Sequence, residues 1–277
     1  MARYANWEGG GPAERGDVRV RRRVAAVLVL LAFNAAALVG VLVVPNSAGA
    51  DAPVPDSVPT VGLPAVGALF LTAKVGALGP HFCTAGVVDS PAGDLVLTAA
   101  HCINGLSPSE FVFVPGYHDG QAPFGVWSVT KVDVDHAWAR SGDPDDDFAF
   151  LVVRQARTRV TVQERTGGEQ LGVDPVPGQV LKVVGYPDAA SSPISCRNTV
   201  LLFNQTQLQF DCGGYTDGTS GSPMVADVNP ATGLGKVVGV IGGYELGGYT
   251  PSVSYAARFG ENMATLYRAA IAGSPGE

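Results

Sequence analysis

The sequence predicts a protein of the all-β class, and two observations lead to this prediction. The 277 residues include 36 glycines and 20 prolines, which interrupt the chain too often for long helices. Between them lie short apolar runs, separated by turn-forming clusters such as Ser90-Pro91-Ala92-Gly93-Asp94. Many short strands with such turns between them are typical of a small antiparallel barrel or sandwich.

The expected strands fall into two groups along the chain. The first group is Val66–Thr72, Phe82–Val88, Leu95–Ala99, Phe111–Val114, Trp127–Val134 and Phe148–Val153. A polar stretch, Arg154–Glu169, connects this group to the next one. The second group is Val180–Val184, Thr199–Phe203, Thr206–Phe210, Met224–Ala226, Lys236–Ile241 and a segment around Ser252–Ala256.

The end of the chain changes its periodicity from that of strands to that of a helix. Apolar residues recur there at helical spacing: Phe259, Met263, Leu266, Tyr267 and Ala270. We therefore expect a C-terminal amphipathic helix that packs on the second group of strands, with core packing as its role.

The N-terminal residues 1–50 indicate export. Six arginines give residues 1–23 a net charge of +3, and four of them directly precede the uncharged apolar run Val24–Val44. Its length fits a membrane span of roughly 20 residues better than a signal-peptide core of about 7–15. Ala48-Gly49-Ala50, however, offers the small residues of a signal-peptidase site, which favours cleavage after Ala50. Both alternatives place the rest of the chain outside the cytoplasm, so we expect a secreted protein or one anchored through residues 24–44.

The composition also limits the classes of binding partner that we expect. Charged residues make up 16% of the chain and the net charge is −7, which gives no electrostatic reason to expect nucleic-acid binding.

Residues 51–60 (DAPVPDSVPT) are proline-rich and are expected to form an extended leader with little structure. We expect a monomer.

An even number of cysteines in an exported chain indicates disulfides. The chain order allows two local pairs, Cys83–Cys102 and Cys196–Cys212, each stabilising the fold by about 3 kcal/mol in the chain-entropy model. A zinc site is the alternative interpretation. The sequence argues against it, because it has no CxxC pair and no histidine near Cys196 or Cys212.

Three short motifs carry residues for nucleophilic catalysis. Leu97-Thr98-Ala99-Ala100-His101-Cys102 places a histidine at the end of an apolar strand, and Asp147-Phe148-Ala149-Phe150-Leu151 places a carboxylate at the start of another. Gly218-Thr219-Ser220-Gly221-Ser222-Pro223 places a serine in a glycine-rich turn. A serine needs a base to remove its proton, and that base needs a third group to hold one tautomer.

These residue types predict a role for each group. His101 is the expected base, Asp147 the carboxylate that orients it, and Ser220 the nucleophile. The glycines around Ser220 allow a tight turn in which the N–H groups of Gly218 and Ser220 converge on a substrate oxygen. No metal and no cofactor are expected. The neighbouring Asp143, Asp145 and Asp146 lack the spacing of a calcium loop and indicate a solvated acidic turn.

The three motifs, in this order, resemble those of the chymotrypsin/trypsin-like serine endopeptidases, and the resemblance covers about residues 60–272. It extends to Phe82-Cys83-Thr84-Ala85-Gly86, Gly185-Tyr186-Pro187 and Gly239-Val240-Ile241-Gly242-Gly243. It implies two antiparallel six-stranded β-barrels, here residues 61–160 and 161–277, with the terminal helix in the second. It also implies a triad in the cleft between the barrels and hydrolysis of polypeptide substrates through an acyl-enzyme.

Two positions depart from the family pattern. The residue before the serine is Thr219, where the usual motif has an aspartate that pairs with a new N-terminus, and this departure resembles the bacterial glutamyl-endopeptidase-like branch. We therefore expect no maturation by N-terminal insertion. Six residues before the serine stands Gly214, so no acidic pocket floor and no Lys/Arg preference are expected. The expected substrate pocket consists of Gly214, Gly242, Gly243 and Tyr244, with Glu245 at its rim.

Two other functions are compatible with parts of this pattern. A catalytically silent protein could keep the protease fold as a binding module, although all three catalytic residue types are present here. A lipase or esterase would need a Gly-x-Ser-x-Gly elbow and a histidine that comes last in the chain, whereas His101 comes first.

Overall fold

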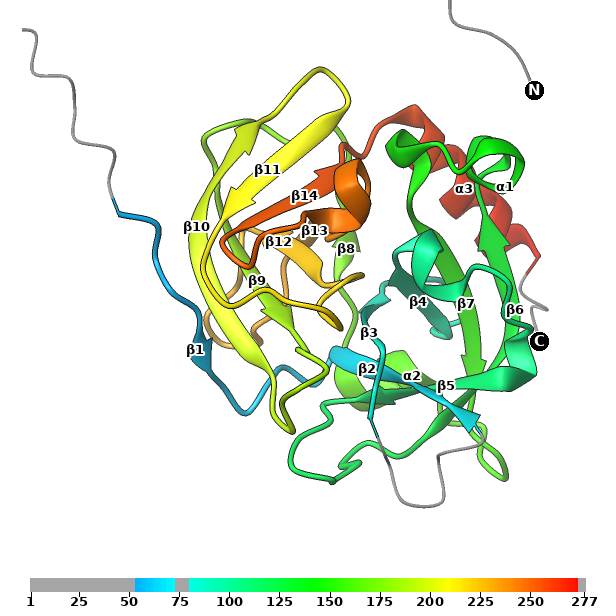
Figure 1. Ribbon diagram of the computed structural model, residues 1–277. Helices are drawn as coiled ribbons and strands as arrows, with labels where there is room; N and C mark the ends of the chain where they lie inside the picture. The colour runs from blue at the N-terminus through cyan, green and yellow to red at the C-terminus, as the bar shows by residue number, and fades with distance from the viewer. Residues whose placement is uncertain (1–52, 73–79, 274–277) are drawn as a thin grey trace, which may run out of the picture. The chain divides into compact units, whose positions relative to one another are not determined.

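The computed structural model describes residues 53–72 and 80–273, and residues 51–277 form one compact unit. No helix within the described residues is long and apolar enough to cross a membrane, and the expected span 24–44 lies outside them. The expected all-β class is confirmed, with two groups of strands and few helices (Figure 1).

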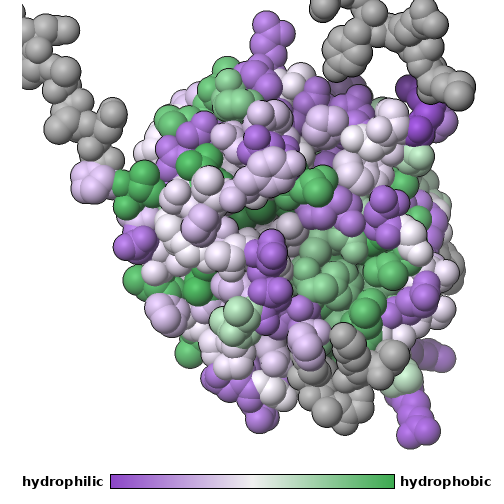
Figure 2. Space-filling model, in the orientation of Figure 1, coloured by the Kyte–Doolittle hydropathy of each residue, from purple (hydrophilic) through white to green (hydrophobic). Residues whose placement is uncertain are grey.

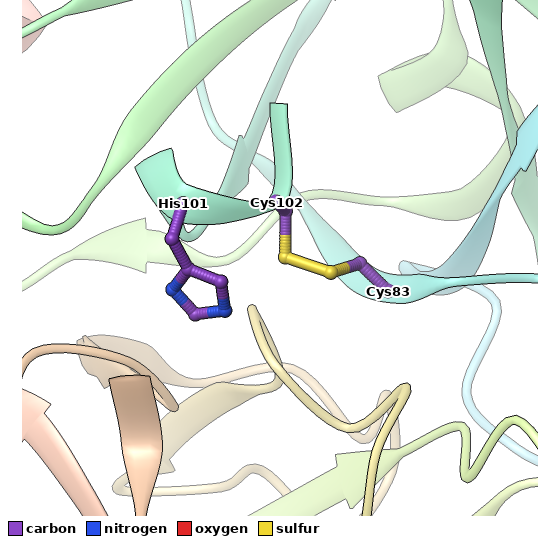
Figure 3. Close-up of side chains that lie close together, drawn as sticks. All are labelled: Cys83, His101 and Cys102. Carbon is purple, nitrogen blue, oxygen red and sulfur yellow. A yellow bond between two sulfur atoms is a disulfide. The ribbon is translucent and has the colours of Figure 1, made fainter. Parts of the chain in front are cut away.

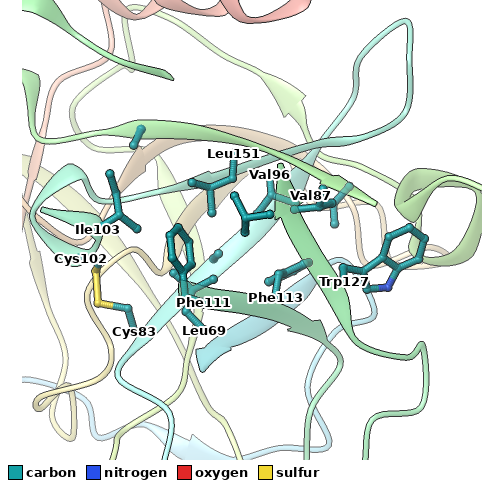
Figure 4. Close-up of a cluster of buried hydrophobic side chains, with 14 of the residues drawn as sticks. Leu69, Cys83, Val87, Val96, Cys102, Ile103, Phe111, Phe113, Trp127 and Leu151 are labelled. Atoms are coloured by element: carbon teal, nitrogen blue, oxygen red, sulfur yellow. A yellow bond between two sulfur atoms is a disulfide. The ribbon is translucent and has the colours of Figure 1, made fainter. Parts of the chain in front are cut away.

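The first group of strands closes into a six-stranded antiparallel barrel in the order β2-β3-β4-β7-β6-β5. Its strands are β2 (Val66–Leu71), β3 (Cys83–Val88), β4 (Leu95–Thr98), β5 (Phe111–Pro115), β6 (Trp127–Val134) and β7 (Ala149–Arg154). Large side chains from opposite walls fill the barrel, including Leu69, Phe113, Trp127 and Leu151 (Figure 4). This packing fixes the ends of β4 and β7, from which two of the predicted catalytic residues emerge.

The second group forms an eight-stranded sheet. Six antiparallel strands make up most of it: β9 (Val180–Gly185), β10 (Ile194–Leu202), β11 (Gln207–Asp211), β12 (Pro223–Ala226), β13 (Lys236–Val240) and β14 (Val253–Ala257). Their order is β14-β11-β10-β9-β12-β13, and a hydrogen bond of 3.0 Å from Gly242 N–H to Tyr255 O brings the two end strands together. The six-stranded arrangement implied by the family resemblance is therefore present, with two short strands added to it.

The first added strand lies in the proline-rich leader, which is more structured than the sequence indicates. Strand β1 (Val58–Pro59) pairs antiparallel with β10, and Ser57 N–H donates to Gly213 O at 3.0 Å. Proline removes only its own N–H, so such a segment can still pair along the edge of a sheet.

The second added strand lies in the connector between the two groups. Strand β8 (Gln170–Leu171) pairs in parallel with β13. Just before it, Glu169 exchanges backbone hydrogen bonds with Val87 and Asp89 of the first barrel. The connector also contains a short helix that we did not expect, α2 (Val162–Thr166), which Thr161 and Glu164 cap. The two groups are thus joined by backbone hydrogen bonds as well as by side chains.

The C-terminal helix exists as predicted, and its buried face joins a core cluster drawn from both groups of strands, including Val240 of β13 and Phe150 of β7. Helix α3 (Glu261–Ala272) packs against β6 and β7 of the first barrel, near the short helix α1 (His136–Ser141) (Figure 1). The ring of Tyr267 meets Phe150 edge-on at 5.8 Å, and the Tyr267 hydroxyl donates to Asp89 O. Periodicity defines the apolar face of a helix, but it does not say which surface covers that face.

Candidate active site

His101 lies on the 3₁₀ turn Ala100–Ile103, directly after the buried strand β4. The next residue, Cys102, forms a disulfide with Cys83 on β3, and the Cα atoms of the pair are 6.2 Å apart (Figure 3). This bond ties the turn to the barrel wall beside the imidazole, whose exposed fraction is 16%. The second predicted disulfide, Cys196–Cys212, is also present.

Possible metal-ligating atoms of Cys83, His101 and Cys102 lie within 4.8 Å of one another. The two sulfurs are bonded to each other, so neither is available as the thiolate that a metal site requires. This group of three residues is therefore a structural disulfide beside a histidine.

Asp147 is fully buried in the short segment between the 3₁₀ turn Pro144–Asp146 and β7. Its Oδ2 lies 2.7 Å from Nδ1 of His101 and accepts from Gly243 N–H at 2.8 Å, and its Oδ1 accepts from the backbone N–H of His101. Because an ionised carboxylate can only accept hydrogen bonds, the proton of a neutral imidazole lies on Nδ1. Nε2 of His101 is then free to accept a proton.

Ser220 lies in a turn that its glycines make possible. Gly218 and Gly221 have φ angles of +88° and +82°, in the left-handed region. A Cβ atom on Gly218 would lie 2.5 Å from the backbone nitrogen of Asp188, and one on Gly221 would lie 2.2 Å from Thr84 O. Both positions therefore require glycine for conformation and for space.

The backbone of this turn is held through its carbonyl groups. Asp217 O accepts from Asp188 N–H at 2.8 Å, and Thr219 O accepts from Ser222 N–H at 3.0 Å and from the Ser222 hydroxyl at 2.6 Å. In a trans peptide the C=O and the following N–H point in opposite directions. The N–H groups of Gly218 and Ser220 therefore point away from these anchors, and neither has a hydrogen-bond acceptor among the described residues.

One open cleft of about 860 Å³ contains most of these groups in its lining: His101, Gly218, Ser220 and the Cys83–Cys102 disulfide. Asp147 lies behind His101, outside the cleft. No hydrogen bond among the described residues joins the Ser220 hydroxyl to His101. Figure 2 shows both hydrophilic and apolar side chains on the viewed face.

The lining of this cleft can be compared with the residues expected to form the substrate pocket. Gly214, Gly242, Gly243 and Tyr244 are not part of this lining. Gly214 faces the Ser57 hydroxyl of the leader, and the ring of Tyr244 packs against those of Phe203 and Tyr255. Glu245, which we expected at the rim, does line the cleft. The rest of the lining beside Ser220 consists of Tyr215, Thr216, Asp217, Thr219, Ile241, Ser254 and residues 246–251. Residues 245–251 include two left-handed non-glycine residues, Glu245 and Leu246, a conformation that motif matching does not reveal.

Sequence reasoning also missed Gln207, which is almost fully buried on β11. Its amide group donates to Pro144 O at 3.0 Å and to the carboxylate of Asp145, while its oxygen accepts from Tyr244 N–H at 3.0 Å. Gln207 thereby connects the turn that precedes Asp147 to the backbone that donates to Asp147. A single glutamine in a strand gives no sequence signal for such a role.

The fold and this cleft together place the protein among the serine-type endopeptidases. The chain belongs to the trypsin-like peptidase family, because the model of the trypsin-like peptidase domain matches residues 83–240.

Solved structures of proteases have the same fold. A protease named Anisep from Arthrobacter nicotinovorans is 25% identical, with a TM-score of 0.65, and the match covers 78% of this chain and 99% of that one. A thermostable serine protease, AL20, from an extremophilic microorganism is 27% identical, with a TM-score of 0.64 and coverages of 78% and 100%. A Glu endopeptidase is similar in fold alone, at 17% identity, a TM-score of 0.61 and coverages of 79% and 97%.

Proposed function

We propose that this protein is an exported endopeptidase that cleaves peptide bonds through an acyl-enzyme on Ser220, with His101 as the base and Asp147 as the group that orients it. One observation carries the proposal. Asp147 binds Nδ1 of His101, which leaves Nε2 as the free ring nitrogen, and His101 lines the same cleft as Ser220. This arrangement supplies a base in the required tautomer in the same cleft as a hydroxyl that has no hydrogen-bond partner among the described residues.

The reaction then follows from the groups around the cleft. His101 Nε2 accepts the proton of the Ser220 hydroxyl as the serine oxygen attacks the substrate carbonyl, and the imidazolium later donates that proton to the leaving amine. The N–H groups of Gly218 and Ser220 stabilise the oxyanion of the tetrahedral intermediate. Water then attacks the acyl-enzyme, with His101 again accepting the proton and returning it to the Ser220 oxygen, and the product with the new carboxyl group is released.

Export is supported by the two disulfides, which form and persist in oxidising compartments. The basic and apolar N-terminal sequence supports the same location. Sequencing the N-terminus of the exported product tests the two alternatives for residues 1–50. Asp51 as the first residue indicates cleavage after Ala50, whereas a retained segment 24–44 indicates an anchor.

A fluorophosphonate probe tests the catalytic proposal, because it phosphonylates only an activated serine. We expect stoichiometric labelling of the folded protein, with the modified peptide containing Ser220. Ser220→Ala should abolish labelling and leave the melting temperature almost unchanged, whereas Ser141→Ala, at an exposed serine of α1, should label like the wild type.

The catalytically silent binding module is the alternative function, and the same experiment separates the two. A well-folded wild-type protein that the probe does not label would support the binding module. Labelling that persists in Ser220→Ala would place the nucleophile at another residue.

A further inference from the structure

Thr84 connects the first barrel to the loop that carries Ser220. It is fully buried on β3, one residue after Cys83 of the disulfide. Its backbone N–H donates to Ser220 O at 2.8 Å, and its hydroxyl donates to Gly218 O at 3.0 Å. Thr84 therefore binds two of the four consecutive carbonyl groups between Asp217 and Ser220.

The same hydroxyl also accepts a hydrogen bond, from Tyr186 N–H at 2.9 Å. Two residues further along, Asp188 N–H binds Asp217 O, the carbonyl opposite the Gly218 N–H. The Thr84 hydroxyl thus binds the Gly218–Thr219 peptide directly. It also binds the segment Tyr186–Asp188, which in turn holds the Asp217–Gly218 peptide. The hydroxyl donates its single proton to Gly218 O and accepts the Tyr186 N–H on a lone pair, so both of its hydrogen bonds have a defined direction.

We infer that the Thr84 hydroxyl is a positioning residue for the oxyanion-binding backbone, acting through Gly218 from the other half of the molecule. This inference rests on the proposed function, since it concerns the same site. A donor contributes to catalysis only when it points to the position that the oxyanion will occupy. Without the hydroxyl, Gly218 O and Tyr186 N–H lose a buried partner. The segment whose Asp188 N–H holds Asp217 O then loses its anchor, so the Asp217–Gly218 peptide can rotate and carry the Gly218 N–H out of the cleft.

The test compares Thr84→Val, which keeps the shape but removes the hydroxyl, with Thr84→Ser, which keeps the hydroxyl. Thr166→Val serves as the control, because Thr166 is a buried threonine on α2 whose hydroxyl binds only local carbonyl groups. We expect Thr84→Val to lower kcat about 10- to 100-fold with KM within about threefold of wild type, because one oxyanion donor is worth about 10²–10³-fold. Thr84→Ser should recover kcat to within about threefold of wild type, and Thr166→Val should leave it unchanged.

A second measurement separates positioning from a general loss of structure. A peptide boronic acid, which forms a tetrahedral anion on the serine, should bind Thr84→Val weaker by the same factor as the fall in kcat/KM. The product peptide with a free carboxylate should bind both proteins to within about threefold. Unchanged kcat in folded Thr84→Val would overturn the inference, as would a Thr84→Ser protein no more active than Thr84→Val. Failure of the wild type to react with the fluorophosphonate would instead contradict the proposed function.

Discussion

Asp147 accepts two hydrogen bonds from His101, one from the ring Nδ1 at 2.7 Å and one from the backbone N–H at 2.8 Å. The second bond fixes the position of the main chain of His101 relative to the carboxylate, so the ring has little freedom to turn away. Gly243 N–H adds a third bond from the other group of strands. The orientation of the imidazole thus depends on both halves of the fold.

Asp147→Asn should lower kcat by about 10⁴-fold while the protein stays folded. The amide can present its NH₂ group to Nδ1, which moves the imidazole proton to Nε2 and removes the base. Steady-state kinetics with a peptide substrate measures the effect. Asp146→Asn is the matched control, because Asp146 is the adjacent buried carboxylate but binds Asn262 of α3 instead of the histidine. Equal losses in both variants would contradict the choice of Asp147.

The sequence was sufficient to predict the strands and to single out the three residues of the proposed triad, because both depend on local signals. Strands β2–β7 are bounded by turn residues, and each motif combines a reactive side chain with a distinctive neighbour such as Cys102 or Gly221. The packing of α3 on the first barrel and the role of Gln207 were not predictable, since they depend on which surfaces meet in three dimensions. The contribution of residues 246–251 to the cleft was not predictable either, because this loop carries no motif and Leu246 has a positive φ angle.

The two disulfides should differ in their effect on activity. Each closes a loop of similar length, with sequence separations of 19 and 16, so replacing either pair by alanines should lower the free energy of unfolding by about 3 kcal/mol. Only the loss of Cys83–Cys102 should also lower kcat at least tenfold, because Cys102 anchors the turn that carries His101. Denaturant melts and kinetics well below the melting temperature separate the two effects. Equal kcat values for the two double variants would contradict this role of Cys102.

Thr219 explains why a new N-terminus should not be needed for activity. It is nearly fully buried, and its hydroxyl donates to Thr216 O at 2.6 Å, so this position of the loop carries no carboxylate that requires a cation. Replacing Asp51 and Pro53 by alanine, or extending the chain before Asp51 by two residues, should leave kcat/KM within about twofold of wild type. A loss of turnover with an unchanged melting temperature would show that the N-terminus takes part in forming the site.

Glu169 should make the stability of the protein depend on pH. It is fully buried beside β3, and among the described residues its carboxylate accepts only from Gly235 N–H, which leaves Oε1 without a partner. Burial raises the pKa of Glu169 from 4.5 to about 7, although the hydrogen bond from Gly235 and the charge of Lys182 act in the opposite direction. The folded protein therefore keeps this proton at pH values where the unfolded chain has released it.

A raised carboxyl pKa contributes stability that is complete below pH 4.5 and is lost as the pH rises through 7. Since one pKa unit corresponds to about 1.4 kcal/mol, the wild type should lose roughly 2–3 kcal/mol of unfolding free energy from this group between pH 5 and 8. Glu169→Gln, which cannot ionise, should lack this loss and should be more stable than the wild type at pH 8. Glu164→Gln is the control, because Glu164 is exposed and glutamine can preserve its capping interaction with Thr161. Urea melts at pH 5 and pH 8 measure the difference, and a Glu169→Gln protein with the same pH dependence as the wild type would show that this carboxyl group does not titrate between those values in the folded state.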